Sequence, residues 1–508
     1  MQPHDAAKRS RRQRRKATSP SQRAASLPWP DDPRRPVFCN RRVRVRIKPR
    51  GQVTPYGGLA LAHALVQGLD LPRAIDRGVP IFKLHLPYHE SDHVLTHTYN
   101  LFAGGDCIED IASLQGSEAF QRLVGACRVP DPTTAGDFLR RFTTPHLGLL
   151  QKVFDAAHEK VWKVLPRKRR RVATVDLDST IKEVYGECKE GADFSYTGKW
   201  SYHPLLISLA ETNECLRLIN RPGNRPSMEG ADVALAEVLE RLVRHFEVVQ
   251  VRGDSACYDQ KLIRACDAQP QVQFAFVMKT CAELVARAEA LPPEAYHRFD
   301  WERPEEAARK GRVEARRHRR RTRKSRARAR GYVTLTTRDQ WVAEFRYCPS
   351  WADRDYRVIV RRQTVATSQG QQTLFARLHY RFIITSIESG SPMEVIRVAY
   401  GRCAQENTIE QLKNGIAAMK MPTGELRANA AFLMAGQLAW NLRAWLSLLA
   451  LPKESLHWEW KRFRHAFIYV AAQVGARARS VRATIAGSHR FAGAFLQAST
   501  RIEALVFR

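Results

Sequence analysis

Three features are scarce in this 508-residue chain: acidic side chains, close pairs of cysteines and long apolar runs. Lys and Arg number 83 against 51 Asp and Glu, which gives a formal net charge of +32. A chain this basic repels itself unless it meets a polyanion, so the expected partner is nucleic acid or an anionic membrane surface. The composition therefore disfavours an enzyme that acts on small metabolites.

The ten cysteines are scattered, and no CxxC pair occurs among them. Zinc ribbons and fingers need close ligand pairs, so we expect reduced thiols in the cytoplasm and no structural zinc. The basic N-terminus is followed by no apolar run, so we expect no secretory signal there. Residues 431–450 are the most apolar late stretch but carry Gln437, Asn441 and Arg443. We therefore expect a buried amphipathic helix there, and no membrane span.

The excess charge is concentrated in two segments. Residues 1–50 carry 16 Lys and Arg against three Asp, and residues 312–330 carry 11 against one Glu. The first segment predicts a disordered arm, and the second a solvated loop or a helix that orders on a polyanion. One such run could equally be a solubilising tail. Two runs favour contacts with nucleic-acid phosphates, for which our candidates in the second run are Arg316, Arg317, Arg319 and Arg320.

The hydrophobic pattern changes period along the chain. Residues 51–165 show helical spacing and suit a DNA-binding domain, although a helical packing domain without a ligand is the alternative. From 166 to 285, strands alternate with helices as in a mixed α/β core covered on both faces. A β-rich insertion or subdomain with four strand-like runs follows over 286–390. Helices are expected again over 391–450, and the last region, 451–508, is expected to be helical and basic.

Two aspartates are expected where neighbouring strands of this core end. Asp176 and Asp178 lie in the predicted strand RVATVDLDST. Asp254 lies where the strand predicted in EVVQVRGDSA ends. Ligand sites gather at strand ends in α/β sheets, and paired carboxylates repel each other unless they share a proton or a cation. With oxygen ligands and no His cluster nearby, that cation would be Mg²⁺. Either Asp alone could be a turn former or a helix cap.

A third acidic candidate lies in a helix expected over about 394–416. Arg402, Glu406 and Lys413 are spaced by four and seven residues, so they share one helix face. For metal-assisted phosphoryl transfer, Glu406 would complete the metal site while Arg402 and Lys413 hold phosphates. Spacing alone favours an ordinary salt-bridged helix face.

These segments, in this order, resemble the DDE transposases of bacterial insertion sequences, in particular the branch with a Y-x2-R-x3-E-x6-K signature. Arg402, Glu406 and Lys413 match its R-x3-E-x6-K part. The Asp-Ser/Thr-Thr step of the family matches Asp178-Ser179-Thr180, and its second Asp matches Asp254. The similarity covers about residues 170–450, and the preceding helical region also looks like that of the family.

The resemblance implies an RNase H-like core in two parts, 166–285 and 391–450, with the β-rich insertion between them. It implies cut-and-paste DNA transposition, with Asp178, Asp254 and Glu406 as the catalytic and metal-binding acids. Two Mg²⁺ ions, replaceable by Mn²⁺, would lie about 3.5–4 Å apart in a site of this type. The partners would be double-stranded DNA at element ends and target, and a second copy of the chain in a synaptic complex. Location at the bacterial nucleoid would follow.

The match departs from the signature at one position and is ambiguous at another. The signature tyrosine falls on Ala399, and the nearest tyrosine, Tyr400, lies off the helix face shared by Arg402 and Glu406. Asp176 is a second candidate for the first acid, and we prefer Asp178 because Ser-Thr follows it. The alternatives to a transposase are an RNase H-like nuclease, an inactive domesticated DNA-binding relative, or a protein that only packages nucleic acid.

Overall fold

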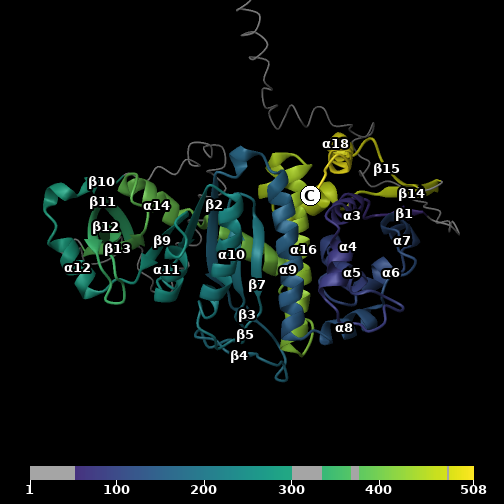
Figure 1. The fold of residues 1–508 in the computed structure, drawn as a ribbon, viewed down its shortest axis with the longest axis horizontal. Coiled ribbons are helices and arrows are strands. Elements are labelled where there is room, and N and C mark those ends of the chain that lie inside the picture. The colour runs from purple at the N-terminus through teal and green to yellow at the C-terminus, as the bar shows by residue number, and fades with distance from the viewer. Residues whose placement is uncertain (1–51, 300–334, 368–376, 478–479, 508) are drawn as a thin grey trace, which may run out of the picture. The chain divides into compact units, whose positions relative to one another are not determined.

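A nine-stranded sheet forms the centre of the fold (Figure 1). The computed structural model describes residues 52–299, 335–367, 377–477 and 480–507. The strand order is β10-β11-β12-β13-β9-β8-β2-β6-β7. The five strands at the end of this order are β2 (Val172–Ser179), β6 (Leu205–Leu209), β7 (Glu214–Ile219), β8 (Val248–Gly253) and β9 (Val272–Met278).

These five strands have the RNase H-like arrangement that the resemblance implied. The neighbouring pairs β7–β6 and β6–β2 are antiparallel, whereas β2–β8 and β8–β9 are parallel. The sequence predicts each of these strands to within a few residues, because short alternating runs of β-branched residues end at polar turns. The prediction of a mixed α/β sheet flanked by helices is confirmed.

The insertion strands continue the same sheet. They are β10 (His297–Arg298), β11 (Leu335–Tyr347), β12 (Tyr356–Thr367) and β13 (Arg377–Thr385). β13 pairs antiparallel with β9, so the insertion is hydrogen-bonded to the core. Two of the four strand-like runs in the sequence form the single strand β11, whose register shifts between Thr337 and Asp339. A bulge of this kind keeps a strand continuous across residues that read as a break.

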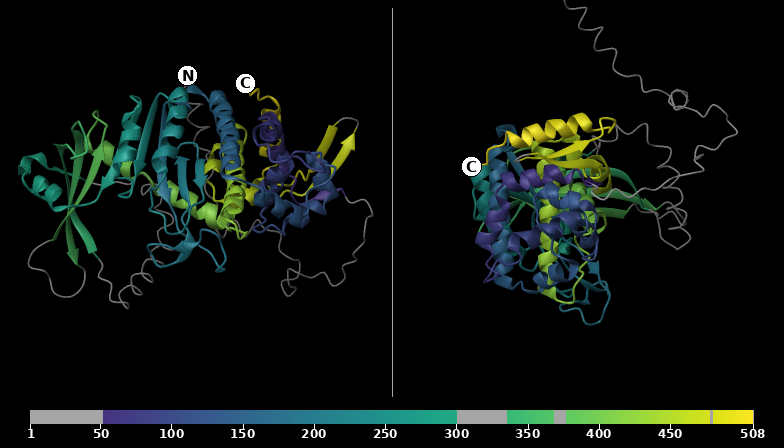
Figure 2. Two further views of the ribbon diagram at one scale, coloured as in Figure 1. Left: turned by 60° about the horizontal axis from the view of Figure 1, so that its bottom comes forward. Right: turned by 90° about the vertical axis from the view of Figure 1, so that its right-hand side faces the viewer.

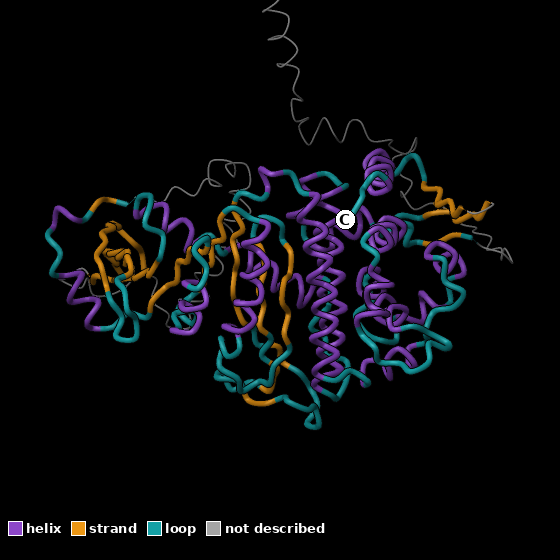
Figure 3. Tube along the Cα trace, in the orientation of Figure 1, coloured by secondary structure: helices purple, strands orange, loops and turns teal. Residues whose placement is uncertain are grey.

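Helices cover both faces of the sheet (Figure 3). On one face, α10 (Ala231–His245) and α11 (Gln260–Asp267) pack on alternate strand residues such as Val175 and Leu177. On the other face, α14 (Pro392–Tyr400) packs on Ala275 and on the insertion strands. Side chains of successive strand residues point to opposite faces. Asp176 and Asp178 therefore point away from Val175 and Leu177, toward the α14 face.

The N-terminal helices share one hydrophobic core with the C-terminal part of the chain. The helix that joins them is α16 (Leu426–Leu449), which contacts α3, α5, α8, α9 and β7. We expected an amphipathic helix here, but α16 is buried on all sides along most of its length. Its polar residues are accommodated by backbone partners: the Asn441 and Gln437 side-chain amides both donate to the Cys215 carbonyl. Buried polar groups of this kind hold an apolar helix in one register.

The C-terminal region differs from the helical segment that the sequence suggested. It contains α17 (Trp460–Phe467) and α18 (Ala492–Glu503), but also a hairpin of β14 (Ala472–Arg477) and β15 (Ser480–Ile485). β14 pairs with β1 (Val53–Thr54), so the two ends of the described chain meet in one small sheet (Figure 2). The strand signal is the alternation of buried residues such as Ala472 and Val474. The many basic residues around this segment hid that alternation in the sequence.

The remaining elements connect these parts. Between Leu59 and Val164 the helices are α3 (Leu59–Gly68), α4 (Leu71–Gly78), α5 (Glu90–Ala103), α6 (Ile111–Gln115), α7 (Glu118–Val124), α8 (Pro132–Arg140) and α9 (Thr144–Val164). A separate three-stranded sheet, β3-β5-β4, consists of β3 (Lys182–Glu183), β5 (Trp200–Tyr202) and β4 (Asp193–Phe194). The others are η1 (Arg167–Arg169), α12 (Ala282–Glu289), η2 (Pro293–Ala295), α15 (Cys403–Glu410), η3 (Gln411–Gly415) and η4 (Lys453–His457).

The two highly basic runs, 1–50 and 312–330, lie outside the described residues, and so do Arg316, Arg317, Arg319 and Arg320. Among the helices that the structure describes, none has the length and apolar character needed to cross a bilayer.

Candidate active site

The first two acids lie at the carboxyl ends of two neighbouring parallel strands, β2 and β8. Asp176 of β2 is paired in register with Arg252 of β8. The ladder ends at this pair: Asp178 lies two residues further along β2, and Asp254 directly follows the last residue of β8, Gly253. Both carboxylates are partly buried, and each accepts a hydrogen bond from a nearby backbone N–H, of Ser179 to Asp178 at 2.8 Å and of Ala256 to Asp254 at 2.9 Å.

A buried ion pair fixes this edge of the sheet. Arg252 donates through Nε and Nη2 to the two carboxylate oxygens of Asp176, at 2.5 and 3.0 Å, and both residues are at most 8% exposed. Its Nη1 also donates to the Val398 carbonyl of α14, at 3.2 Å. Arg252 therefore ties both acid-bearing strands to the helix that precedes Glu406. The pair uses Asp176 as a structural anion, which leaves Asp178 as the candidate for the first catalytic acid.

The third acid lies on a helix that is broken, not continuous. The sequence suggested one helix over 394–416, but α14 ends at Tyr400 and α15 begins at Cys403. Gly401 and Arg402 form the turn between them. A Cβ on Gly401 would lie 2.3 Å from Arg252 Nη1, so the turn packs directly on the buried ion pair. Beyond α15 the chain continues in a π-helical turn, η3, which carries Lys413. Exposed Glu406 lies one turn into α15.

The carboxylates of Asp254 and Glu406 act electrostatically on that of Asp178. The pKa of Asp178 is raised above its usual value, first by burial and then by the negative charges of Asp254 and Glu406. Arg402, whose Nη2 lies 3.2 Å from Asp178 Oδ2, and the Ser179 N–H oppose that rise. Three carboxylates that raise a pKa in this way favour a shared cation.

Two of the predicted phosphate-binding side chains reach toward the same edge. Arg402 donates to the Leu177 carbonyl at 2.9 Å, and Lys413 Nζ donates to the Ile181 carbonyl at 2.8 Å. The pKa of Lys413 is lowered by burial and by neighbouring Lys182, which sequence reasoning missed. The signal for Lys182 was its place two residues after the Asp-Ser-Thr step. Arg402, Lys413 and Lys182 thus form a cationic rim beside Asp178.

Tyr400 is the last residue of α14 and contacts the insertion strands. The Arg361 guanidinium of β12 stacks over its ring, at 5.5 Å from the centroid. Burial lowers the pKa of Arg361, and the interaction with the Tyr400 hydroxyl partly offsets this shift. In this structure Tyr400 joins α14 to the insertion strands.

Comparison with known families decides the class. Residues 36–507 match the family described as "Transposase DDE domain group 1". The chain belongs to this family. No curated protein matches the sequence. Among solved structures, one similar chain is from a cryo-EM structure titled as a piggyBac transposase synaptic complex with hairpin DNA, at 9% identity and a TM-score of 0.29. The alignment covers 80% of this chain and 82% of the other.

The donor set of this DDE transposase suits a divalent metal. Its three candidate ligands are all carboxylates, the oxygen donors that Mg²⁺ and Mn²⁺ prefer. Their ligand atoms are not gathered to within 4.8 Å of one another. Within the described ranges, that spacing is reached only by Asp106, Cys107 and Asp110, where Asp110 accepts the backbone N–H groups of the other two in a turn. Asp178, Asp254 and Glu406 therefore offer the right kind of donor atom and remain candidate ligands, with their ligand atoms spread more widely than in a gathered site.

Proposed function

We propose that this transposase cuts and joins DNA at the ends of its own mobile element, with Asp178, Asp254 and Glu406 as the catalytic acids. The observation that carries the proposal is that Asp254 and Glu406, from two other segments of the chain, lie near enough to Asp178 for their charges to raise its pKa. The proposal includes the insertion-sequence type and the cut-and-paste outcome that the sequence resemblance implies.

The residues of the site have separate roles in binding metal, binding phosphate and positioning the strands. Asp178, Asp254 and Glu406 would hold two Mg²⁺ ions, or Mn²⁺ in their place. When bound, such ions activate the attacking water or 3′-hydroxyl and stabilise the leaving oxygen. Arg402 and Lys413 hold the phosphate oxygens next to the scissile bond, as guanidinium and ammonium groups do. Arg252 holds the two acid-bearing strands against α14.

The test is a cleavage and strand-transfer assay on linear DNA that carries the inverted repeats flanking the gene, with Mg²⁺ or Mn²⁺. Glu406→Gln should lower the cleavage rate about a thousand-fold, because several kcal/mol of transition-state stabilisation are lost, while DNA binding is kept. The matched control is Glu410→Gln, one turn further along α15, where the exposed carboxylate accepts a hydrogen bond from Asn414. That variant should cleave at the wild-type rate.

The alternatives predict different results in the same assay. Nicking without joining supports an RNase H-like nuclease, and binding without cleavage by the wild-type protein supports an inactive DNA-binding relative. A Glu406→Gln protein that still excises DNA contradicts the assignment of the site. Two element ends must be held together during transposition, so we also expect a dimer on DNA. Native mass spectrometry with one and two ends tests that expectation.

A further inference from the structure

A basic cavity lies at the edge of the sheet opposite the acids. Its volume is about 530 Å³, and it is lined by η1, by Arg171 and Val172 where β2 begins, by the turn between β6 and β7, and by η4. Asp178 lies near the other end of β2, six residues from Val172. At about 3.3 Å per residue, some 20 Å of strand separates the cavity from the candidate active site.

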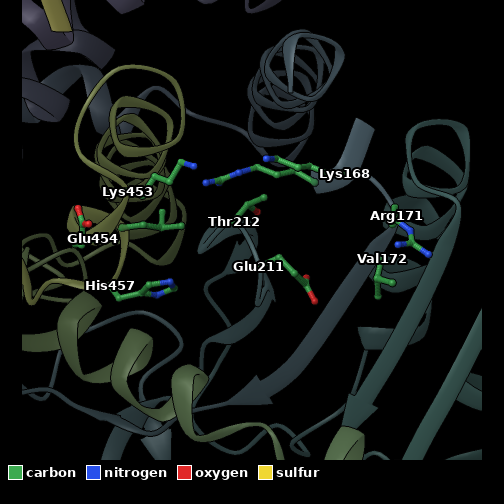
Figure 4. A pocket seen from close by; sticks show the side chains of 10 residues that line it. Lys168, Arg171, Val172, Glu211, Thr212, Lys453, Glu454 and His457 are labelled. Atoms are coloured by element: carbon green, nitrogen blue, oxygen red, sulfur yellow. The ribbon is translucent and has the colours of Figure 1, made fainter. Parts of the chain in front are cut away.

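The cations of this cavity are available for a ligand. Lys168 and Arg169 come from η1, and Lys453 comes from η4. Figure 4 shows the Lys453 and Lys168 side chains pointing toward each other across the cavity. In the part of the chain that the structure describes, no carboxylate lies within 4.0 Å of the charged groups of Lys168, Arg169 or Lys453.

The acidic residues of the lining do not neutralise these cations. Glu211 accepts hydrogen bonds from the backbone N–H and the hydroxyl of Thr174, at 2.8 and 2.5 Å. The carboxylate of Glu454 points away from the centre of the cavity (Figure 4). Glu247, outside the lining, approaches Arg171 only to 4.0 Å. The His457 ring adds a hydrogen-bonding group to the lining of the cavity. The pKa of His457 is lowered first by burial, then by the positive charge of Arg443 and then by that of Arg169.

We propose that this cavity binds the phosphodiester backbone of duplex DNA at a point distant from the scissile phosphate. Lys and Arg that converge without carboxylate partners are suited to phosphate oxygens. A separation of about 20 Å corresponds to about six steps along one DNA strand. Such binding requires the bound duplex, or its continuation, to pass along the protein from the acids to this opposite edge of the sheet. The inference rests on the proposed function, since it names how the same enzyme holds its DNA.

The test uses the salt dependence of binding by the full-length protein. The cavity variant is the triple substitution Lys168→Gln, Arg169→Gln and Lys453→Gln. The control variant removes equal charge from exposed positions elsewhere, with Lys152→Gln, Lys261→Gln and Lys279→Gln. Fluorescence anisotropy with an element-end duplex is measured from low to physiological salt. Each lost phosphate contact reduces the magnitude of the negative slope of log K against log salt by about 0.9. The slope of the cavity variant should therefore be about 2 to 3 smaller in magnitude than that of the wild type.

Equal slopes in the two triple variants would overturn the inference. So would a cavity variant that loses binding of inorganic phosphate, followed by ³¹P NMR, while its DNA slope is unchanged, because the site would then hold a small anion. Circular dichroism verifies that both variants are folded. The outcome is separable from that of the active site: the cavity variant should cleave normally at saturating DNA. Failure of the Glu406→Gln test would leave the difference in slope intact.

Discussion

Two carboxylates of the core sheet, Glu214 and Asp178, show how differently one fold can treat an acid. Glu214, where β7 begins, is fully buried and accepts hydrogen bonds from His158 Nδ1 at 2.8 Å, Trp445 Nε1 at 2.7 Å and Trp162 Nε1 at 2.9 Å. Asp178 is only partly buried and has one backbone donor and one arginine. The first acid is surrounded by donors, and the second faces other acids.

The difference appears in the direction of the two pKa shifts. Burial alone would raise the pKa of Glu214, but the hydrogen bonds and charge of His158, with further donors, hold it below its usual value. Burial and the neighbouring Asp254 and Glu406 raise the pKa of Asp178. A satisfied buried acid stabilises the fold, whereas an acid held near like charges is typical of a functional site. This contrast leads to four predictions.

The largest effect is expected on catalysis at Asp178. Asp178→Asn should lower the cleavage rate about a thousand-fold, through the loss of a metal ligand. Its free energy of unfolding, measured in urea without metal, should equal or exceed that of the wild type, because one of three repelling charges is removed. A large loss of stability would mean that Asp178 is structural like Glu214.

The next effect is on stability at Glu214. Glu214→Gln should cost about 3 kcal/mol of unfolding free energy, because breaking a buried pair leaves His158 without its anion. Cleavage per folded molecule, measured at a temperature where the variant is folded, should be unchanged. Lower activity with unchanged stability would remove the distinction between the two acids.

These same residues show which parts of the fold and of the candidate site could be predicted from the sequence. Strand ends at Asp178 and Asp254 are predictable, because alternating β-branched residues and polar turns are local signals. The pair of Asp176 with Arg252 joins residues 76 positions apart, so no local pattern reveals it. Glu214 reads only as a strand residue, since its donors come from α9 and α16. The helix break at Gly401 and Arg402 was missed because the signature spacing also fits one continuous helix.

A smaller effect on catalysis is expected at Arg252. Arg252→Lys keeps the charge but loses the two-pronged contact with Asp176 and the bond to Val398. We expect cleavage to slow by about 10- to 100-fold, the usual cost of disturbing groups that orient metal ligands. The rate at saturating DNA should fall, with little change in DNA affinity. Arg354→Lys, at a largely exposed pair with Asp267, is the control and should retain full activity. A weakened affinity with an unchanged maximal rate would place Arg252 in DNA binding instead.

The subtlest prediction concerns pH and the origin of the stability that Glu214 provides. Because its folded-state pKa lies below the unfolded value of 4.5, the ionised carboxylate stabilises the fold above that pH. The contribution is lost as the pH falls through the folded-state pKa. The gap in unfolding free energy between wild type and Glu214→Gln should therefore be widest near neutral pH and narrow below about 4.5. Urea unfolding at several pH values measures it. A gap that stays constant to the lowest pH would show that packing of the side chain, and not its charge, stabilises the junction of β7, α9 and α16.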